Sequence, residues 1–234
     1  IIKPTPTNAL VKATLIHGAR NMPGQYALDK LDVRAKPDYN QGWGRIDLFE
    51  SLFPSPPKIQ KFDDHIIGVN TGDKVDYTFD VTDSTVPVEA TLVWDDFPGT
   101  VGSWGNLVNN LDLVVWDPQG REYRGNIYTA PIGSSSISQP DPGPVHDSVN
   151  NVERVVIPPP VRKGTYKVRV MGAWVQQTAP NIPQSYALVY SGGMGKIEAL
   201  PPPAVPIAPW TLFLLVILLL AFAVLHLRRN LGRV

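Results

Sequence analysis

The chain has 234 residues, of which 43% are hydrophobic and 18% charged, and this balance excludes an intrinsically disordered protein. Its 21 basic residues equal its 21 acidic ones, so the excess of positive charge that binds a phosphate backbone is missing, and nucleic acid is not an expected partner. Cysteine is absent, which excludes disulfides, thiolate metal sites and a cysteine nucleophile.

The N-terminal segment IIKPTPT has neither an initiator methionine nor the pattern of a signal peptide. An initiator methionine is normally removed only before a small residue, so we do not expect Ile1 to be the start of translation. We therefore expect the chain to be the C-terminal part of a longer protein.

A helix is predicted directly after this segment. Thr5 and Pro6 are typical of an N-cap followed by the first helical position, and apolar residues with helical spacing follow up to Gly18. One helix and a Gly-Trp-Gly turn cannot bury enough apolar surface to offset chain entropy. We therefore expect the first fifty residues to pack on an upstream fragment or on a neighbouring subunit.

Beyond the proline cluster at 54–57 the apolar period changes from that of a helix to that of a strand. Val75, Tyr77, Phe79 and Val81 alternate with polar residues, as in a strand with one buried face. Similar runs lie at about 59–68, 87–94, 111–117, 121–128, 151–157, 165–172 and 185–191. About eight short strands predict a mainly β fold, an antiparallel β-sandwich of jelly-roll type.

Two connections between these runs have distinct characters. Asp117-Pro118-Gln119-Gly120 predicts a turn that joins two strands in a hairpin. Residues 130–145 show no periodicity, so a surface loop is predicted there, with ordering against a partner subunit as the alternative.

Carboxylates and carboxamides are concentrated in two stretches, 91–117 and 147–157. Such side chains either cap turns or surround a hard cation, because calcium takes six to eight oxygen ligands in a flexible arrangement. The sequence leaves both interpretations open. The candidate calcium ligands are Asp95, Asp96, Asn106, Asn110, Asp112, Asp147, Asn150 and Glu153.

Several of these segments together resemble a known family. LVNNLDLVVWDPQG at 107–120, YRGN at 123–126 and DSVNNVERVVI at 147–157 are similar to the β-sandwich domain that follows the protease domain in a group of subtilisin-like serine peptidases. PTNALVKATLIHGA followed by NQGWGRIDL at 40–48 resembles the end of that protease domain. The resemblance implies a protease-domain remnant at 1–53, a sandwich at 58–193, and a calcium ion, which such domains often carry.

The resemblance implies acyl transfer through a serine, but the chain lacks the residues for it. The GTSMAxP motif that carries the nucleophile in this family is absent, and none of His17, His65, His146 and His226 stands in a recognisable triad order. We predict a helix-end role for His17 and a structural role for His146, the strongest functional candidate among the four. The chain alone is therefore expected to be inactive.

The C-terminal part predicts a membrane anchor. A proline-rich spacer at 194–208 leads to an apolar segment at 209–228, uncharged up to Leu227, which is long enough to cross a bilayer as a helix. Trp210 lies at the start of this segment, and Arg228, Arg229 and Arg233 lie at its end and in the tail 229–234, which predicts a cytoplasmic C-terminus and a sandwich outside. The lipid bilayer is thus an expected partner.

The sequence leads to one principal functional hypothesis and two alternatives. The principal one is a membrane-anchored, extracytoplasmic portion of a subtilisin-like serine endopeptidase, whose partner is an upstream protease fragment. The first alternative is a non-catalytic accessory subunit that docks to neighbouring subunits of a membrane complex. The second is a carbohydrate-binding sandwich, with a platform formed by Trp94, Trp104, Trp116 and Trp174.

Overall fold

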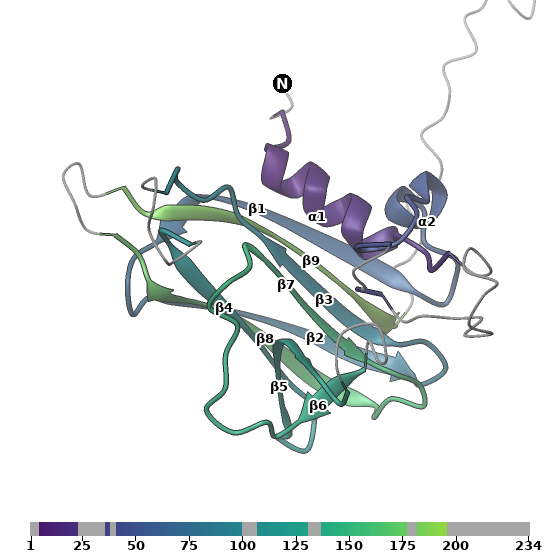
Figure 1. The fold of residues 1–234 in the computed structure, drawn as a ribbon. Coiled ribbons are helices and arrows are strands. Elements are labelled where there is room, and N and C mark those ends of the chain that lie inside the picture. The colour runs from purple at the N-terminus through teal and green to yellow at the C-terminus, as the bar shows by residue number, and fades with distance from the viewer. Residues whose placement is uncertain are drawn as a thin grey trace, which may run out of the picture. The chain divides into compact units, whose positions relative to one another are not determined.

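The computed structural model describes residues 5–22, 36–37, 41–99, 107–130, 137–176 and 182–195 (Figure 1). The chain divides into two compact units, Ile1–Gly195 and Lys196–Val234, and every described residue belongs to the first. The predicted membrane helix 209–228, the tail 229–234 and most of the spacer lie outside the described residues. Within the described ranges, no helix is long and apolar enough to cross a membrane.

The described part is mainly β, and its strands pair in antiparallel fashion, as predicted. Strand β9 pairs with β1 and β3, and β3 pairs with β7, which forms one layer. Strand β8 lies between β2 and β4 in the other layer, which continues to β5 and β6. The strands are β1 (Ile59–Val69), β2 (Lys74–Asp83), β3 (Val88–Val93), β4 (Asn110–Trp116), β5 (Glu122–Tyr128), β6 (Ser138–Pro140), β7 (Val152–Ile157), β8 (Gly164–Trp174) and β9 (Gln184–Met194).

The two layers are joined along one edge, where Val81 and Asp83 of β2 pair with Met194 and Gly193 of β9. The main core lies between the layers and includes Leu92, Leu111, Leu113, Val168 and Leu188. In β8 the buried residues alternate with more exposed ones, as expected for a strand with one face in the core. Strands β3 and β9 are buried along nearly their whole length instead, because a helix covers their outer face.

That helix is α1 (Asn8–Gly18), which lies on the outer face of the β1–β9–β3–β7 layer (Figure 1). Its N-cap is Thr7, not the predicted Thr5, and the Thr7 side chain accepts a hydrogen bond from the Leu10 N–H at 3.1 Å. Its buried face packs on the chain's own sheet, and the cluster comprises Ala9, Ala13, Ile16, Val93, Val152, Ala187 and Val189. The expectation that this helix would need another fragment or subunit to pack on was therefore wrong for its inner face.

The short helix α2 (Leu48–Leu52) is held close to the end of α1. Asp47 caps it by accepting the Glu50 N–H at 3.0 Å, and Arg20 forms an ion pair with Asp47 at 2.6 Å. A Cβ atom on Gly18 would lie 2.4 Å from the Ser51 hydroxyl oxygen, so only glycine permits this approach. The segment around α2 is thus attached to α1.

Two predictions about connections have different outcomes. The turn Asp117–Gly120 is confirmed, since the Gly120 N–H donates to the Asp117 carbonyl at 2.9 Å and β4 pairs with β5. The predicted loop 130–145 contains the short strand β6, which periodicity cannot detect because it is only three residues long and ends in proline. The side chain of Ser138 in β6 accepts the Val156 N–H at 2.9 Å, which attaches this edge to β7.

Candidate functional site

The candidate calcium ligands that follow β3 form their own turn. The Asp96 carboxylate accepts the N–H groups of Val108 at 2.7 Å and Asn109 at 2.8 Å, and so joins the two ends of the β3–β4 connection. Asp95 is exposed, and its carbonyl accepts the Gln184 side-chain amide at 3.0 Å. Asn106 lies outside the described residues. Asp96 is therefore a turn former in this structure.

The carboxylates of Asp112, Asp147 and Glu153 come together where β4, β5 and β7 meet. Glu153 points into the interior, where one carboxylate oxygen accepts the Leu113 N–H at 2.7 Å. Burial raises the pKa of Glu153 well above its usual value, although the Leu113 N–H lowers it, and the nearby Asp112 and Asp147 raise it further. The surroundings of Glu153 thus favour its protonated form.

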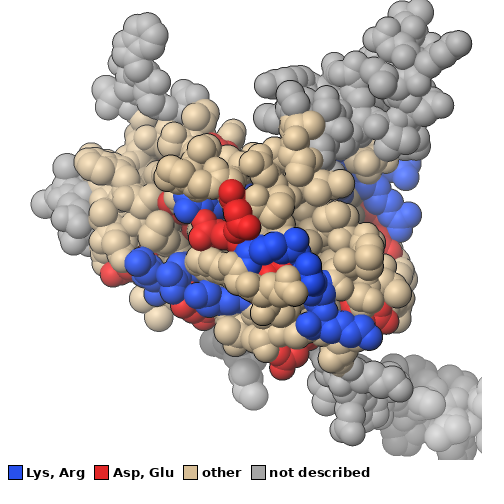
Figure 2. All heavy atoms as spheres, turned by 90° about the horizontal axis from the view of Figure 1, so that it is seen from below, with Lys and Arg blue, Asp and Glu red and all other residues tan. Residues whose placement is uncertain are grey.

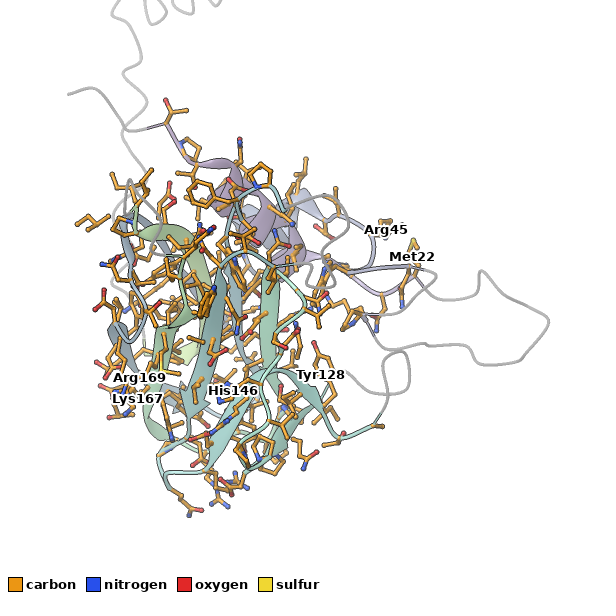
Figure 3. The ribbon with its side chains drawn as sticks, turned by 60° about the vertical axis from the view of Figure 1, so that its left-hand side comes forward. Met22, Arg45, Tyr128, His146, Lys167 and Arg169 are labelled. Carbon is orange, nitrogen blue, oxygen red and sulfur yellow. The ribbon has the colours of Figure 1, made fainter. Side chains whose placement is uncertain are left out.

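His146 connects the loop before β7 to the outer face of β4 (Figure 3). Its Nδ1 lies 3.0 Å from an Asp112 carboxylate oxygen, and Arg124 donates to its Nε2. Because a guanidinium can only donate, Nε2 is the acceptor in this contact, and Nδ1 is the ring nitrogen that faces the Asp112 carboxylate. Burial also raises the pKa of Asp112. The contacts agree with the structural role predicted for His146.

Asn126 closes the gap between β5 and β7 with its side chain. Its amide donates to the Val152 carbonyl at 2.7 Å, and its amide oxygen accepts the Arg154 N–H at 3.1 Å, as a backbone peptide does in a sheet. The residue adopts a φ of 58°, a left-handed conformation that asparagine tolerates. A Cβ atom on the preceding Gly125 would lie 2.1 Å from a Glu153 carboxylate oxygen, so this position requires glycine. The YRGN motif therefore has a structural role, which sequence analysis did not assign.

The cluster has few free ligand atoms for a metal. Asp147 accepts from the side chains of Asn126 at 2.6 Å and Asn150 at 2.8 Å. Glu153 Oε1 and Asn110 Oδ1 are buried and have no hydrogen-bond partner in the described part of the chain. No group of three or more histidine and carboxylate side chains there has an arrangement that could hold a metal ion. Calcium binding by the eight candidates therefore stays a prediction.

A second polar cluster lies beneath the end of α1. Glu89 accepts from Arg154 at 2.5 Å and from Lys58 at 2.6 Å. Although burial raises the pKa of Glu89, the two cations bring it below its usual value. His17 Nδ1 lies 3.0 Å from the Thr91 hydroxyl, and its Nε2 lies 2.8 Å from that of Ser191. Burial lowers the pKa of His17 well below its usual value, so the ring is neutral and fixes α1 to the sheet.

The His17 contact with Ser191 does not form a peptidase site. The other ring nitrogen contacts a threonine hydroxyl instead of a carboxylate, and Ser191 is completely buried. His65 stacks on Tyr186, and His146 contacts Asp112, while His226 lies outside the described residues. None of the three described histidines is therefore placed between a serine and a carboxylate.

The carbohydrate platform is not present among the described tryptophans. Trp94 is fully buried, and Lys167 and Arg169 lie 4.1 and 5.3 Å from the centre of the Trp116 ring. Trp174 is exposed, and Trp104 lies outside the described residues. Seen from below, Lys and Arg side chains lie beside Asp and Glu rather than forming a face of one sign (Figure 2).

The outward side of α1 and α2 is apolar, and we call it the helical surface. A groove of about 520 Å³ runs along α1 and is lined mainly by Val11, Leu15, Ile16, Ala19, Trp43 and Ile46. The exposed large apolar residues that continue it are Leu48, Phe49, Leu52 and Phe53. Large exposed apolar surfaces occur at contacts with proteins, membranes or ligands.

The described strands form a mainly β, antiparallel and nearly closed sheet, and its helices carry exposed apolar side chains. No protein-family model matches the chain. The chain is distantly related to proteins of Dictyostelium discoideum named serine protease/ABC transporter B family proteins: it is 34% identical to tagA over 203 residues, 28% to tagD over 232 and 29% to tagB over 231. These matches cover 80% to 82% of this chain but only 10% to 12% of each relative. The chain thus spans about a tenth of the length of these relatives.

Proposed function

We propose that this chain is the extracytoplasmic β-sandwich portion of a membrane-anchored, subtilisin-like serine peptidase, and that the catalytic residues belong to another part of that protein. The observation that carries the proposal is the similarity to three proteins named serine protease/ABC transporter, which extends over about four fifths of the chain. The resemblance of three separate segments to the β-sandwich domain that follows a subtilisin-like protease domain also supports it.

The helical surface is the proposed contact with the peptidase portion. The inner face of α1 is already buried on the sheet, whereas the side chains of Phe49 and Phe53 are 63% and 66% exposed. Covering an aromatic side chain buries a large apolar area, which stabilises a protein contact. In this arrangement α1 lies between the sandwich and the peptidase portion and contacts both.

The first test is N-terminal sequencing and intact-mass measurement of the native protein. The proposal expects an upstream segment, attached or co-purifying, that contains the serine, histidine and aspartate of a peptidase triad. A native chain that is isolated with membrane-complex subunits but without any triad-bearing segment would instead favour the alternative, a non-catalytic docking subunit.

The second test addresses the helical surface. Phe49→Asp and Phe53→Asp should each reduce co-purification of the upstream segment, because a charge would have to be buried in the contact. Thr78→Asp on the exposed side of β2 is the matched control and should leave co-purification unchanged. Retention of the upstream segment by both Phe variants would show that it binds elsewhere.

The proposed anchor is the apolar segment 209–228, with the tail 229–234 in the cytoplasm. Its support is the sequence alone: a bilayer-length uncharged run with arginines behind it. Protease treatment of intact cells should digest the sandwich, and a tag placed after Val234 should stay protected. A tag that is accessible from outside the cell would reverse the proposed orientation.

A further inference from the structure

Strand β1 is an edge strand of its layer (Figure 1). Within the described part of the chain it pairs with β9 and with no other strand. From Ile59 to His65 each residue opposes one residue of β9, and the register shifts between His65 and Val69. The other edge of this regular stretch, which we call the free edge, thus has backbone N–H and C=O groups that no described strand pairs with.

Three consecutive side chains next to the free edge are accessible. Ile59 packs against the main core, so the odd-numbered residues of the stretch face the other layer. Among them, Asp63 accepts a hydrogen bond from Tyr77 of β2, yet its side chain is 35% exposed. Lys61 is exposed and has no ion-pair partner among the described residues. Phe62 lies on the opposite face and is 45% exposed. These three side chains can therefore contact a further strand.

The charges of β1 are self-complementary in one antiparallel register. When two copies continue one sheet with their inner faces on the same side, odd-numbered residues oppose odd-numbered ones. With Phe62 opposite Phe62 of the second copy, each Lys61 lies opposite Asp63 of the other copy. One step of the register in either direction replaces these pairs by Lys61 opposite Lys61 or by Asp63 opposite Asp63. Opposite charges stabilise a cross-strand pair and like charges destabilise it, so the register centred on Phe62 is favoured.

This pattern indicates which strand pairs with the free edge. A lysine on an edge strand is a common protection against pairing with other chains. Charges of a single sign repel every copy of the same strand, whereas Lys61 and Asp63 attract their counterparts in a second copy. The pattern therefore favours a second copy of this chain over a strand of another protein.

We infer that this chain forms a two-fold symmetric dimer through the free edge of β1, with Phe62 at the symmetry axis. The β1–β9–β3–β7 layers of the two copies then form one continuous sheet. Backbone hydrogen bonds join the strands, two Lys61–Asp63 pairs fix the register, and the two Phe62 rings meet on the outer face. The dimer contact uses none of the residues of the helical surface, and the inference does not rest on the proposed peptidase association.

Cross-linking of the full chain in detergent tests the register. The chain has no cysteine, so one introduced cysteine reports one position. A short bifunctional thiol reagent should link two copies of Phe62→Cys, because directly opposed Cβ atoms lie about 4.5–5.5 Å apart. Ile67→Cys is the control on the same strand, since Ile67 is 80% exposed. In the proposed register its two copies lie roughly 30 Å apart, so it should be linked at least tenfold more slowly.

Charge variants in the Phe62→Cys background test the pairing of Lys61 with Asp63. Lys61→Asp places like charges across the axis and should slow the linking about tenfold. Because Lys61 is exposed and forms no ion pair among the described residues, its replacement should leave the melting temperature unchanged, and this variant is decisive by itself. Asp63→Lys should also slow the linking, and a mixture of the two variants should restore it as mixed dimers.

Three results would overturn the inference. One is linking of Ile67→Cys as fast as that of Phe62→Cys, and another is linking of Phe62→Cys that Lys61→Asp leaves unchanged. The third is no linked dimer of Phe62→Cys. If that cysteine is linked to a different protein in native membranes instead of a second copy, the free edge takes a foreign strand and the proposed dimer is wrong.

Discussion

His17 is a residue whose ionisation is suppressed by its surroundings, and this predicts a pH dependence of stability. Burial lowers its pKa in the folded state, whereas the unfolded side chain titrates at about 6.5. The unfolded state therefore binds more protons than the folded state below about pH 6.5. As the pH is lowered from there, His17 should reduce the free energy of unfolding by up to about 1.4 kcal/mol per pH unit.

The variant His17→Gln removes this titration and keeps polar contacts with Thr91 and Ser191. Its unfolding free energy, measured by urea denaturation, should depend less steeply on pH between about 6.5 and 5 than that of the unmodified chain. Its absolute stability at neutral pH is expected to be lower, since the ring's packing is lost. Parallel pH profiles for the two proteins would show that His17 accepts a proton in the folded state.

For Glu153 the predicted pH dependence of stability has the opposite sign to that of His17. Its pKa is raised in the folded state, so its contribution is fully present below the unfolded value of about 4.3 and is lost as pH rises through the folded value. Glu153→Gln keeps an acceptor for the Leu113 N–H without a carboxylate to ionise. This variant should therefore unfold at a higher temperature than the unmodified chain at pH 8 and show no such gain at pH 4. A lower melting temperature at pH 8 would indicate that the charged carboxylate has a stabilising partner.

At the scale of elements, Asn126 joins β5 to β7 without a backbone ladder. Asn126→Gly keeps the left-handed conformation but removes the bonds to Val152 and Arg154, so we expect a loss of about 2–3 kcal/mol of unfolding free energy. Asn150→Ala, which removes an exposed bond to Asp147, is the control and should cost less than about 1 kcal/mol. Similar losses of unfolding free energy in both variants would mean that these amides stabilise the loop before β7 rather than the contact between β5 and β7.

The elements that sequence analysis predicted correctly are those with local signals. The alternation of Val75 to Val81 and the Asp117–Gly120 turn depend on neighbouring residues, and both are confirmed. The N-cap was misplaced by two positions because Thr5 and Thr7 have the same chemistry, and only Thr7 also contacts Asp64, at 2.6 Å.

The contacts that sequence analysis missed join residues far apart in the chain. His17 meets its partners 74 and 174 positions away, and Asn126 meets β7 across 26 and 28 positions. Periodicity and motif spacing carry no information about such pairs. The oxygen-rich composition of the acidic cluster was visible in sequence, but whether its oxygens would face backbone N–H groups or a cation depended on the packing of β4, β5 and β7.

At the scale of the whole molecule, calcium binding can be separated from turn formation by melting experiments. An ion that binds only the folded state must raise its stability. If the candidates bind calcium, the melting temperature of the full chain in detergent should be higher with calcium than with excess chelator, and Glu153→Gln should reduce that difference. An unchanged midpoint, together with no calcium in elemental analysis, would leave these residues as turn formers.

Strand β9 is the last strand of the described chain, yet it pairs with β1, β2 and β3. A nascent polypeptide emerges with its N-terminus first, so β1 is exposed long before β9, the strand with which it pairs. Until residues 184–194 emerge, the unpaired edge of β1 stays open to other chains, together with its exposed Phe62, Ile66 and Ile67. Synthesis or export therefore has to deliver the whole sequence through Met194 before the sheet can close, and a premature stop ahead of Gln184 should yield aggregating material rather than a domain that lacks one strand.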